Sequence, residues 1–171
     1  MRNNKKLIVY PVLFTLTISA IIFSCEPETP FSKKKVIYYN PLTDEKFDLN
    51  DQLQSTKLVR VLAKEEQEIS IIQNPTILNL TDNKGDFKAI SMTYQIGEFI
   101  TKLTIPLSEI NSNESKGETH YMRVAESCEM KCTTSWPCSS CTQEIIQRCA
   151  SQTCTCNNGS SGCSSSIIFS D

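Results

Sequence analysis

The clearest periodic pattern in the chain is an alternation of apolar and polar residues between Ile90 and Ile96, in the sequence ISMTYQI. A period of two is typical of a β-strand that buries one face. Gly97 and Glu98 then permit a reversal, and residues 99–107 again place apolar side chains at alternate positions. The pattern therefore predicts a β-hairpin over residues 90–107.

Turn residues and short apolar runs predict further strands on both sides of this hairpin. The sequence DNKG at residues 82–85 is a turn signal between two strand-like segments. A short helix is expected over residues 48–55, with Leu49 and Leu53 on one face. The further strands are expected over residues 36–39, 58–63, 76–80, 87–90 and 120–125. Six to eight short strands predict a mainly β domain, sandwich or barrel-like, over residues 36–126.

A basic segment followed by an uncharged apolar run opens the chain. Arg2, Lys5 and Lys6 precede a stretch without charge from Leu7 to Phe23. This combination is typical of a secretory signal peptide, and the stretch is shorter than the ~20 residues of a usual spanning helix. We therefore expect residues 1–24 to be a signal peptide that is removed. An uncleaved membrane anchor is the alternative.

The end of this run resembles the signal of bacterial lipoproteins. In Ile22-Phe23-Ser24-Cys25, a branched apolar residue stands three positions before the cysteine and a small residue directly before it, as in that family. The resemblance covers residues 1–25 alone. It implies that Cys25 is lipidated, with acyl chains such as palmitate, and that the mature protein begins there. Simple secretion with an unmodified Cys25 is the alternative.

The resemblance implies a place in the bacterial cell envelope, lipid-anchored at a membrane such as the outer membrane and facing either the periplasm or the surface. Residues 25–35 carry prolines and charges, which predicts an extended tether. Removal of residues 1–24 changes the net charge from −2 to −5, since three basic residues and no acidic residue are lost. A mildly acidic chain lacks the basic face that nucleic-acid binding requires, so the membrane is the expected partner and nucleic acid is not.

No catalytic arrangement is recognisable in the β-rich segment. His120 is the only histidine of the chain, and a lone histidine is more often a surface or partly buried side chain than a general base. The acidic residues Asp44, Glu45, Asp48 and Asp51 lack the glycine and terminal glutamate of a helix-loop-helix calcium site, and are expected to form a solvated loop. We therefore expect no enzyme activity, no cofactor and no metal here.

Composition changes sharply at Cys128, because eight of the nine cysteines follow from there. Lipidation of Cys25 would leave an even number, and disulfides persist in exported proteins. A segment so poor in large apolar residues requires cross-links or metal. We therefore predict a small disulfide-rich α+β module over residues 127–171. The eight cysteines allow about a hundred different sets of disulfide pairings. They are Cys128, Cys132, Cys138, Cys141, Cys149, Cys154, Cys156 and Cys163.

Local patterns predict mixed structure in this module. Ser140 and Gln143 match a capping box, and Cys141, Ile145 and Cys149 would share one face of a helix over residues 141–149. The i, i+4 spacing of Cys128 and Cys132 suits a helical turn. Two cysteines at positions 154 and 156 would share a strand face, and residues 157–162 form a turn toward a partner strand over residues 163–169.

Two alternatives give these cysteines a chemical role. The segment from Trp136 to Cys141, WPCSSC, resembles the thioredoxin active site, in which a CxxC opens a helix that favours a thiolate. The resemblance implies a thiol–disulfide redox protein that uses Cys138 and Cys141, although Pro137 interrupts the family's Trp-Cys pair and only 30 residues follow Cys141. The second alternative is a metal-binding module, in which sets of four cysteines hold zinc or an iron–sulfur cluster.

The sequence therefore favours a non-enzymatic cell-envelope lipoprotein. Its disulfide-stapled module would bind a protein or glycan ligand, or would protect the β-rich domain. Disulfides suit a binding role because they keep ligand-facing loops ordered and so reduce the entropy that is lost on binding.

Overall fold

A computed structural model describes residues 34–169, except residues 42, 114–116 and 125–126. The predicted signal peptide, Cys25 and nearly all of the tether lie outside the described residues, so those interpretations stay predictions. In the described part of the chain, no helix has both the length and the apolar character that crossing a membrane requires.

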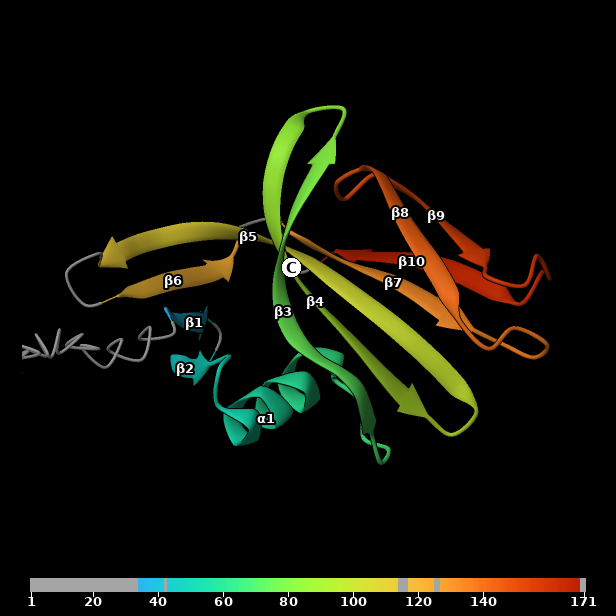
Figure 1. Ribbon diagram of the computed structural model, residues 1–171, viewed down its shortest axis with the longest axis horizontal. Helices are drawn as coiled ribbons and strands as arrows, with labels where there is room; N and C mark the ends of the chain where they lie inside the picture. Colours follow the sequence, from blue (N-terminus) through green and yellow to red (C-terminus); the bar gives the residue numbers. More distant parts are fainter. Residues whose placement is uncertain (1–33, 42, 114–116, 125–126, 170–171) are drawn as a thin grey trace, which may run out of the picture. The chain divides into compact units, whose positions relative to one another are not determined.

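The described chain is mainly β, with a disulfide-rich C-terminal module, which confirms the predicted fold class (Figure 1). Its elements are β1 (Lys35–Asn40), β2 (Glu45–Asp48), α1 (Gln52–Ala63), β3 (Ser70–Asp82), β4 (Gly85–Ile96), β5 (Phe99–Asn113), β6 (Glu118–Arg123), β7 (Cys128–Thr134), β8 (Cys141–Gln147), β9 (Ser151–Cys156) and β10 (Cys163–Phe169).

The long strand β5 organises the larger of two sheets. One edge of β5 pairs with β4, which pairs in turn with β3. The other edge pairs with β7 over residues 101–104 and with β6 over residues 107–113. From there the sheet continues through β7 to β10, and through β6 to β1 and β2. All of these pairs are antiparallel except β1 with β6, which is parallel. Strands β8 and β9 form a separate two-stranded ribbon.

The apolar core lies between α1 and this large sheet. Ile90, Met92 and Tyr94 of β4 are almost fully buried in it, which confirms the alternation that the sequence showed. The hairpins at residues 82–85 and 97–98 are also confirmed. Leu103 and Ile105 of β5 complete the centre of the cluster. This half of the fold therefore follows the ordinary rule that period-two apolar positions face the core.

The helix is longer and starts later than predicted. Asp51 caps it, since its carboxylate accepts from the backbone N–H of Leu53 at 2.9 Å and of Gln54 at 3.1 Å. The strand predicted over residues 58–63 is wrong, because these residues complete α1. Leu58 and Leu62 belong to its buried face, whereas Leu53 is 79% exposed. The apolar run at 58–63 is thus one face of a helix packed on the sheet.

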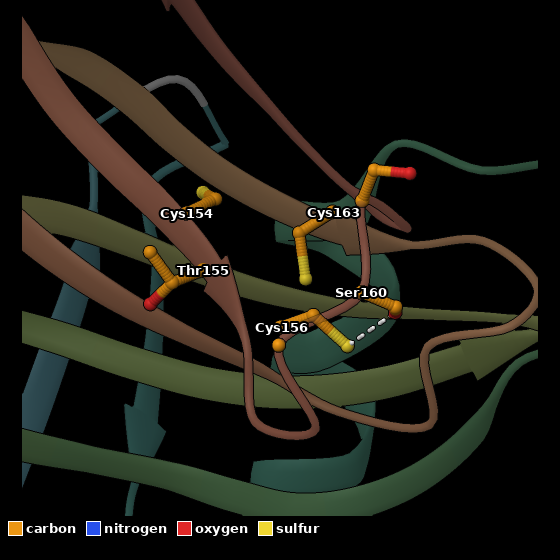
Figure 2. A pocket seen from close by; sticks show the side chains of 7 residues that line it. Cys154, Thr155, Cys156, Ser160 and Cys163 are labelled. Carbon is orange, nitrogen blue, oxygen red and sulfur yellow. Dashed lines mark hydrogen bonds between the residues drawn. The ribbon is translucent and has the colours of Figure 1, made fainter.

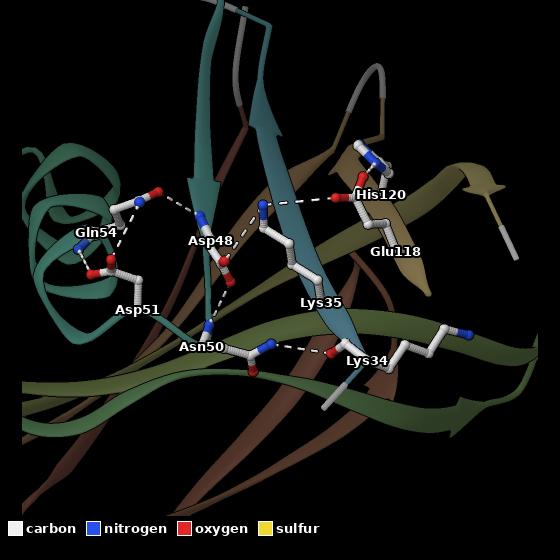
Figure 3. A network of polar contacts seen from close by, with 8 residues as sticks. All are labelled: Lys34, Lys35, Asp48, Asn50, Asp51, Gln54, Glu118 and His120. Carbon is white, nitrogen blue, oxygen red and sulfur yellow. Dashed lines mark hydrogen bonds and ion pairs between the residues drawn. The ribbon is translucent and has the colours of Figure 1, made fainter. Parts of the chain in front are cut away.

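Charged side chains connect the first strands of the sheet, as Figure 3 shows. Lys35 Nζ lies 3.9 Å from Asp48 Oδ2 and 3.7 Å from Glu118 Oε1, and so joins β1 to β2 and β6. His120 Nε2 lies 3.3 Å from Glu118 Oε2 and is half-buried, as expected of a lone histidine. The solvated acidic loop is partly wrong, since Glu45 and Asp48 lie in β2.

The predicted helix over residues 141–149 is wrong, because residues 141–147 form β8. Along β8, side chains alternate between half-buried and exposed, with Gln143 facing inward and Glu144 outward. The predicted helical turn between Cys128 and Cys132 is also wrong, since both lie in β7. The strand predicted over residues 163–169 exists as β10, but it pairs with β7 and not with β9.

The cysteine-rich segment contributes β7 and β10 to the large sheet. Strands from both sides of residue 126 thus share one hydrogen-bonded network. The boundary at residues 126 and 127 stays a prediction.

Candidate functional site

Four disulfides join the strands and loops of the C-terminal module. They link Cys128 to Cys149, Cys132 to Cys154, Cys138 to Cys156 and Cys141 to Cys163. Each closes a loop of 18 to 22 residues. A loop of that size corresponds to a stabilisation of about 3 kcal/mol per disulfide in the chain-entropy account. Covalent bonds are therefore a major source of stability in this module.

Strand register brings two of these disulfides together. In the β8–β9 ribbon, Cys141 stands opposite Cys156. Cys163 opens β10, and Cys138 lies in the loop that precedes β8. The Sγ atoms of Cys138, Cys156 and Cys163 all lie within 4.8 Å of one another. Figure 2 shows Cys156 and Cys163 beside a shallow pocket of about 210 Å³.

Two loops meet at this end of the module. We call residues 135–141 and 156–163 together the stapled tip. The backbone N–H of Ser135 donates to the carbonyl of Gly162 at 2.6 Å, and that of Cys138 donates to the carbonyl of Ser135 at 2.8 Å. Asn158 Nδ2 donates to the carbonyl of Pro137 at 3.3 Å. Hydrogen bonds and two disulfides therefore fix the loops against each other.

Gly162 is required by this close approach. A Cβ atom at that position would lie only 2.7 Å from Cys138 Cβ and 2.9 Å from Cys138 N, nearer than carbon and nitrogen atoms pack. Larger residues would push the two loops apart. The sequence shows a glycine at position 162, but it does not show that this glycine faces the loop that contains Cys138.

Trp136 stands out on the tip because it is 90% exposed. It is the only tryptophan of the chain, and it lies in the turn that Ser135 and Cys138 close. An aromatic side chain of this size is normally at least half-buried in a folded protein. A fixed backbone here presents a large apolar surface to solvent.

The surface around Trp136 carries no charged side chain from its own loops. Residues 132–143 and 149–163 contain neither Asp, Glu, Lys nor Arg. Instead they offer hydroxyl and amide groups, among them those of Ser139, Ser161 and Asn157. An ionic ligand would find no partner of opposite charge in these segments.

Polar side chains of the β8–β9 ribbon connect it to the large sheet. Gln143 Nε2 donates to the carbonyl of Met130 at 3.0 Å, and its Oε1 accepts from Thr104 Oγ1 at 2.8 Å. Gln152 Nε2 donates to the carbonyls of Lys131 at 3.0 Å and Ser166 at 2.8 Å. These bonds connect β8 and β9 to β5, β7 and β10, beside the buried side chain of Met130.

An ion pair connects the opposite end of the ribbon to the β3–β4 turn. Asp82 accepts from Arg148 Nε at 3.1 Å and from its backbone N–H at 2.8 Å. The Arg148 guanidinium also lies 4.5 Å from the centre of the Phe87 ring. Burial favours a raised pKa for Asp82, but these bonds and one from the Lys84 N–H outweigh it and lower its pKa to about 2.

Glu129 is a buried carboxylate that the sequence did not reveal. It lies on the face of β7 opposite to that of Cys128 and Cys132. Glu129 is 2% exposed, with Arg123 Nη1 at 3.2 Å, Lys64 Nζ at 3.1 Å and Lys131 Nζ at 3.8 Å. It thereby ties β7 to the end of α1 and to β6. Its surroundings indicate a structural role, since burial without these cations would be unfavourable.

The structure differs from the predicted thioredoxin-like arrangement in two ways. Cys138 and Cys141 are bonded to different partners, Cys156 and Cys163. Cys141 opens a strand, so no helix N-terminus is available to stabilise a thiolate. The metal-binding alternative required free thiolates, whereas the structure joins all eight sulfurs in disulfides.

Comparison with protein-family models, with curated proteins and with solved structures found no match to this chain. Its functional interpretation therefore depends on the geometry of the stapled tip and on the sequence.

Proposed function

We propose that this protein is a non-enzymatic lipoprotein of a bacterial cell envelope, and that its stapled tip binds an uncharged glycan. The observation that carries the binding role is Trp136, 90% exposed on a turn that hydrogen bonds and a disulfide close. The lipoprotein assignment is supported by the signal-like sequence that ends at Cys25. Four disulfides are compatible with an oxidising compartment outside the cytoplasm.

The energetic argument starts from the size of the tryptophan side chain. An indole buries on the order of 150–250 Å² when it is covered, and apolar burial contributes about 25 cal/mol per Å². A flexible loop would lose much of that gain to ordering on binding. Here the loops are already joined by Cys138–Cys156 and Cys141–Cys163, so little ordering remains to be done.

The chemistry of the surrounding residues favours a neutral ligand rich in hydroxyl groups. The flat face of an indole matches the apolar face of a sugar ring. Side-chain hydroxyl and amide groups of the same loops can donate to and accept from sugar hydroxyls. The absence of Asp, Glu, Lys and Arg from residues 132–143 and 149–163 disfavours acidic polysaccharides and basic peptides.

Intrinsic fluorescence tests the binding role, because Trp136 is the sole tryptophan. The full chain, purified from envelopes in mild detergent, is titrated with neutral oligosaccharides and, in parallel, with an acidic polysaccharide. We expect a blue shift of the emission with the neutral ligand, little effect of salt, and no response to the acidic one. An emission spectrum that no neutral oligosaccharide changes would contradict the proposal.

Calorimetry with matched variants separates a role of Trp136 from a general effect on the module. Trp136→Ala should weaken binding at least tenfold, since an aromatic anchor typically contributes 2 kcal/mol or more, about thirtyfold in affinity. Phe169→Ala is the control, because Phe169 is also exposed, at 64%, but lies at the end of β10. Equal losses in both variants would argue against a contact at the tip.

Metabolic labelling tests the anchor separately. Radiolabelled palmitate should enter the wild-type protein and should be absent from Cys25→Ser. Intact mass spectrometry of the wild type should show an acylated N-terminus at Cys25. An unlabelled wild-type protein that begins at another residue would contradict lipidation and would leave the binding experiment unaffected.

A further inference from the structure

The two disulfides of the stapled tip are in direct contact. Cys138 Sγ lies 3.3 Å from Cys163 Sγ, although the two sulfurs belong to different disulfides. Cys138, Cys156 and Cys163 form a sulfur cluster within 4.8 Å, and Cys141 is bonded to one of its members. In the described residues, the sulfurs of Cys128–Cys149 and Cys132–Cys154 belong to no such cluster. Four sulfurs of the module are thus grouped, and four are not.

A second pairing of the same four sulfurs is compatible with the fold. Cys138 and Cys163 are already in contact. The remaining two, Cys141 and Cys156, stand directly opposite each other on β8 and β9. Opposite residues of antiparallel strands have Cα atoms about 4.5–5.5 Å apart, which lies within the range that a disulfide spans. Neither alternative bond requires a strand to change its partner.

Cys156 is well placed to leave as a free thiol. Its Sγ lies 3.1 Å from the hydroxyl of Ser160, a donor, and 2.7 Å from Asn158 Oδ1, an acceptor. Figure 2 shows Ser160 directed at this sulfur. A thiol or thiolate released at Cys156 would therefore find hydrogen-bond partners in place. The adjoining pocket, lined by Cys156 and Cys163, gives solvent access.

We propose that the stapled tip is a thiol–disulfide exchange site that reacts with dithiols and has two alternative pairings. A dithiol reduces Cys141–Cys163 and is itself oxidised to a disulfide, which leaves thiols at both cysteines. The Cys163 thiolate then attacks Cys138 Sγ, the Cys138–Cys156 bond breaks, and the electron pair leaves with Cys156. The product contains Cys138–Cys163 and two thiols, at Cys141 and Cys156.

Oxidation of these last two thiols completes the second pairing. A disulfide between Cys141 and Cys156 forms when a partner in its disulfide form accepts their two electrons and two protons and becomes a dithiol. The module then again contains four disulfides. The exchange thus converts one fully oxidised tip into another, with an intermediate that exposes a thiol beside the pocket.

Limited reduction tests this inference on the full-length protein in detergent. One equivalent of dithiothreitol is added, free thiols are alkylated with N-ethylmaleimide, and unreduced peptic peptides are mapped by tandem mass spectrometry. We expect label on Cys141 and Cys156 and a new Cys138–Cys163 disulfide, with Cys128–Cys149 and Cys132–Cys154 intact. Label confined to Cys141 and Cys163, or first label on the other two disulfides, would overturn the proposal.

A pair of variants repeats the test without a reductant. In Cys141→Ser, the unpaired Cys163 should exchange with Cys138, so that at least a tenth of the label appears on Cys156. Cys149→Ser is the matched control, because the Cys128 that it frees has no sulfur cluster beside it in the described residues. There the label should stay on Cys128. Label in Cys141→Ser that remains on Cys163 alone would contradict exchange.

Discussion

The two faces of the large sheet are covered in different ways. Leu103 and Thr104 are neighbours on β5, so their side chains point to opposite faces. Leu103 belongs to the apolar core beneath α1, whereas Thr104 donates to Gln143 of β8. The α1 cover is held by apolar burial. The ribbon is held mainly by side-chain hydrogen bonds and disulfides, with Met130 as a buried apolar side chain on that face. The difference shows what a covering layer needs when it has few large apolar residues to bury.

Each face should therefore respond to its own kind of substitution. Hydrogen bonds exchange with water and contribute about 1 kcal/mol each, so the glutamines of β8 and β9 alone would hold the ribbon weakly. Disulfides add stability that does not depend on buried area. Variants on the α1 face should reduce global stability, and variants on the ribbon face should act locally.

The largest effect is expected from Leu103→Ala. Leu103 is fully buried at the centre of the core, and truncation of such a leucine costs about 2–5 kcal/mol. Denaturant unfolding measures the loss. Leu53→Ala, at an exposed position of α1, is the control and should change stability by less than about 0.5 kcal/mol. Similar losses in both would mean that α1 does not cover the sheet.

The next effect is expected when the link between β7 and β9 is removed in Cys132→Ser/Cys154→Ser. The loss should be about 2–4 kcal/mol, as for a typical disulfide. Hydrogen exchange followed by mass spectrometry should show faster exchange in β8 and β9 with little change in α1. Faster exchange of equal size in α1 would remove the distinction between the two faces.

A smaller and more local effect is expected from Gly162→Ala. The added methyl group would meet Cys138 and force the two loops of the tip apart, and overpacking of this kind typically costs about 1–3 kcal/mol. The fluorescence anisotropy of Trp136 should fall, since its turn loses support. Ser161→Ala, at the exposed neighbouring residue, should leave anisotropy unchanged. Unchanged anisotropy in Gly162→Ala would mean that the turn around Trp136 does not depend on the close contact between the two loops.

The smallest effect concerns the ion pair between Asp82 and Arg148. The folded pKa of Asp82 is lowered to about 2 from an ordinary value of 3.8. Its stabilising contribution is therefore complete above about pH 4 and is lost as the pH falls toward 2. Asp82→Asn should remove this part of the acid dependence while stability at pH 7 decreases modestly. Thermal unfolding between pH 2 and 7 measures both, and an acid profile that Asp82→Asn does not alter would contradict it.

The sequence predicted the apolar face well and the ribbon face poorly, for a physical reason. Ile90, Met92 and Tyr94 reveal their strand because the core selects apolar residues at every second position. On β8 the inward positions are Cys141, Gln143, Ile145 and Gln147. Gln143 is held there by hydrogen bonds to Thr104 and Met130. Because two glutamines lie on the inner face and Ile146 lies exposed on the outer one, β8 shows little hydrophobic periodicity.

The error over residues 141–149 has the same origin. Cys141, Ile145 and Cys149 recur at a spacing that suits a helix, but disulfides bind the two cysteines to β10 and β7. Tertiary bonds thus override a local pattern. Cysteine count and location predicted a disulfide-rich module, whereas the pairing and the exposure of Trp136 depend on strand register that local sequence does not contain.

Strand β5 also determines how far this protein can reach. The described chain begins at β1, which is joined through β6 to residues 107–113 of β5, while the ribbon and its tip are joined through β7 to residues 101–104. From residue 101 to residue 113, an extended strand is about 40 Å long. Strand β5 thus separates the end of the sheet at which the described chain begins from the end that carries the stapled tip.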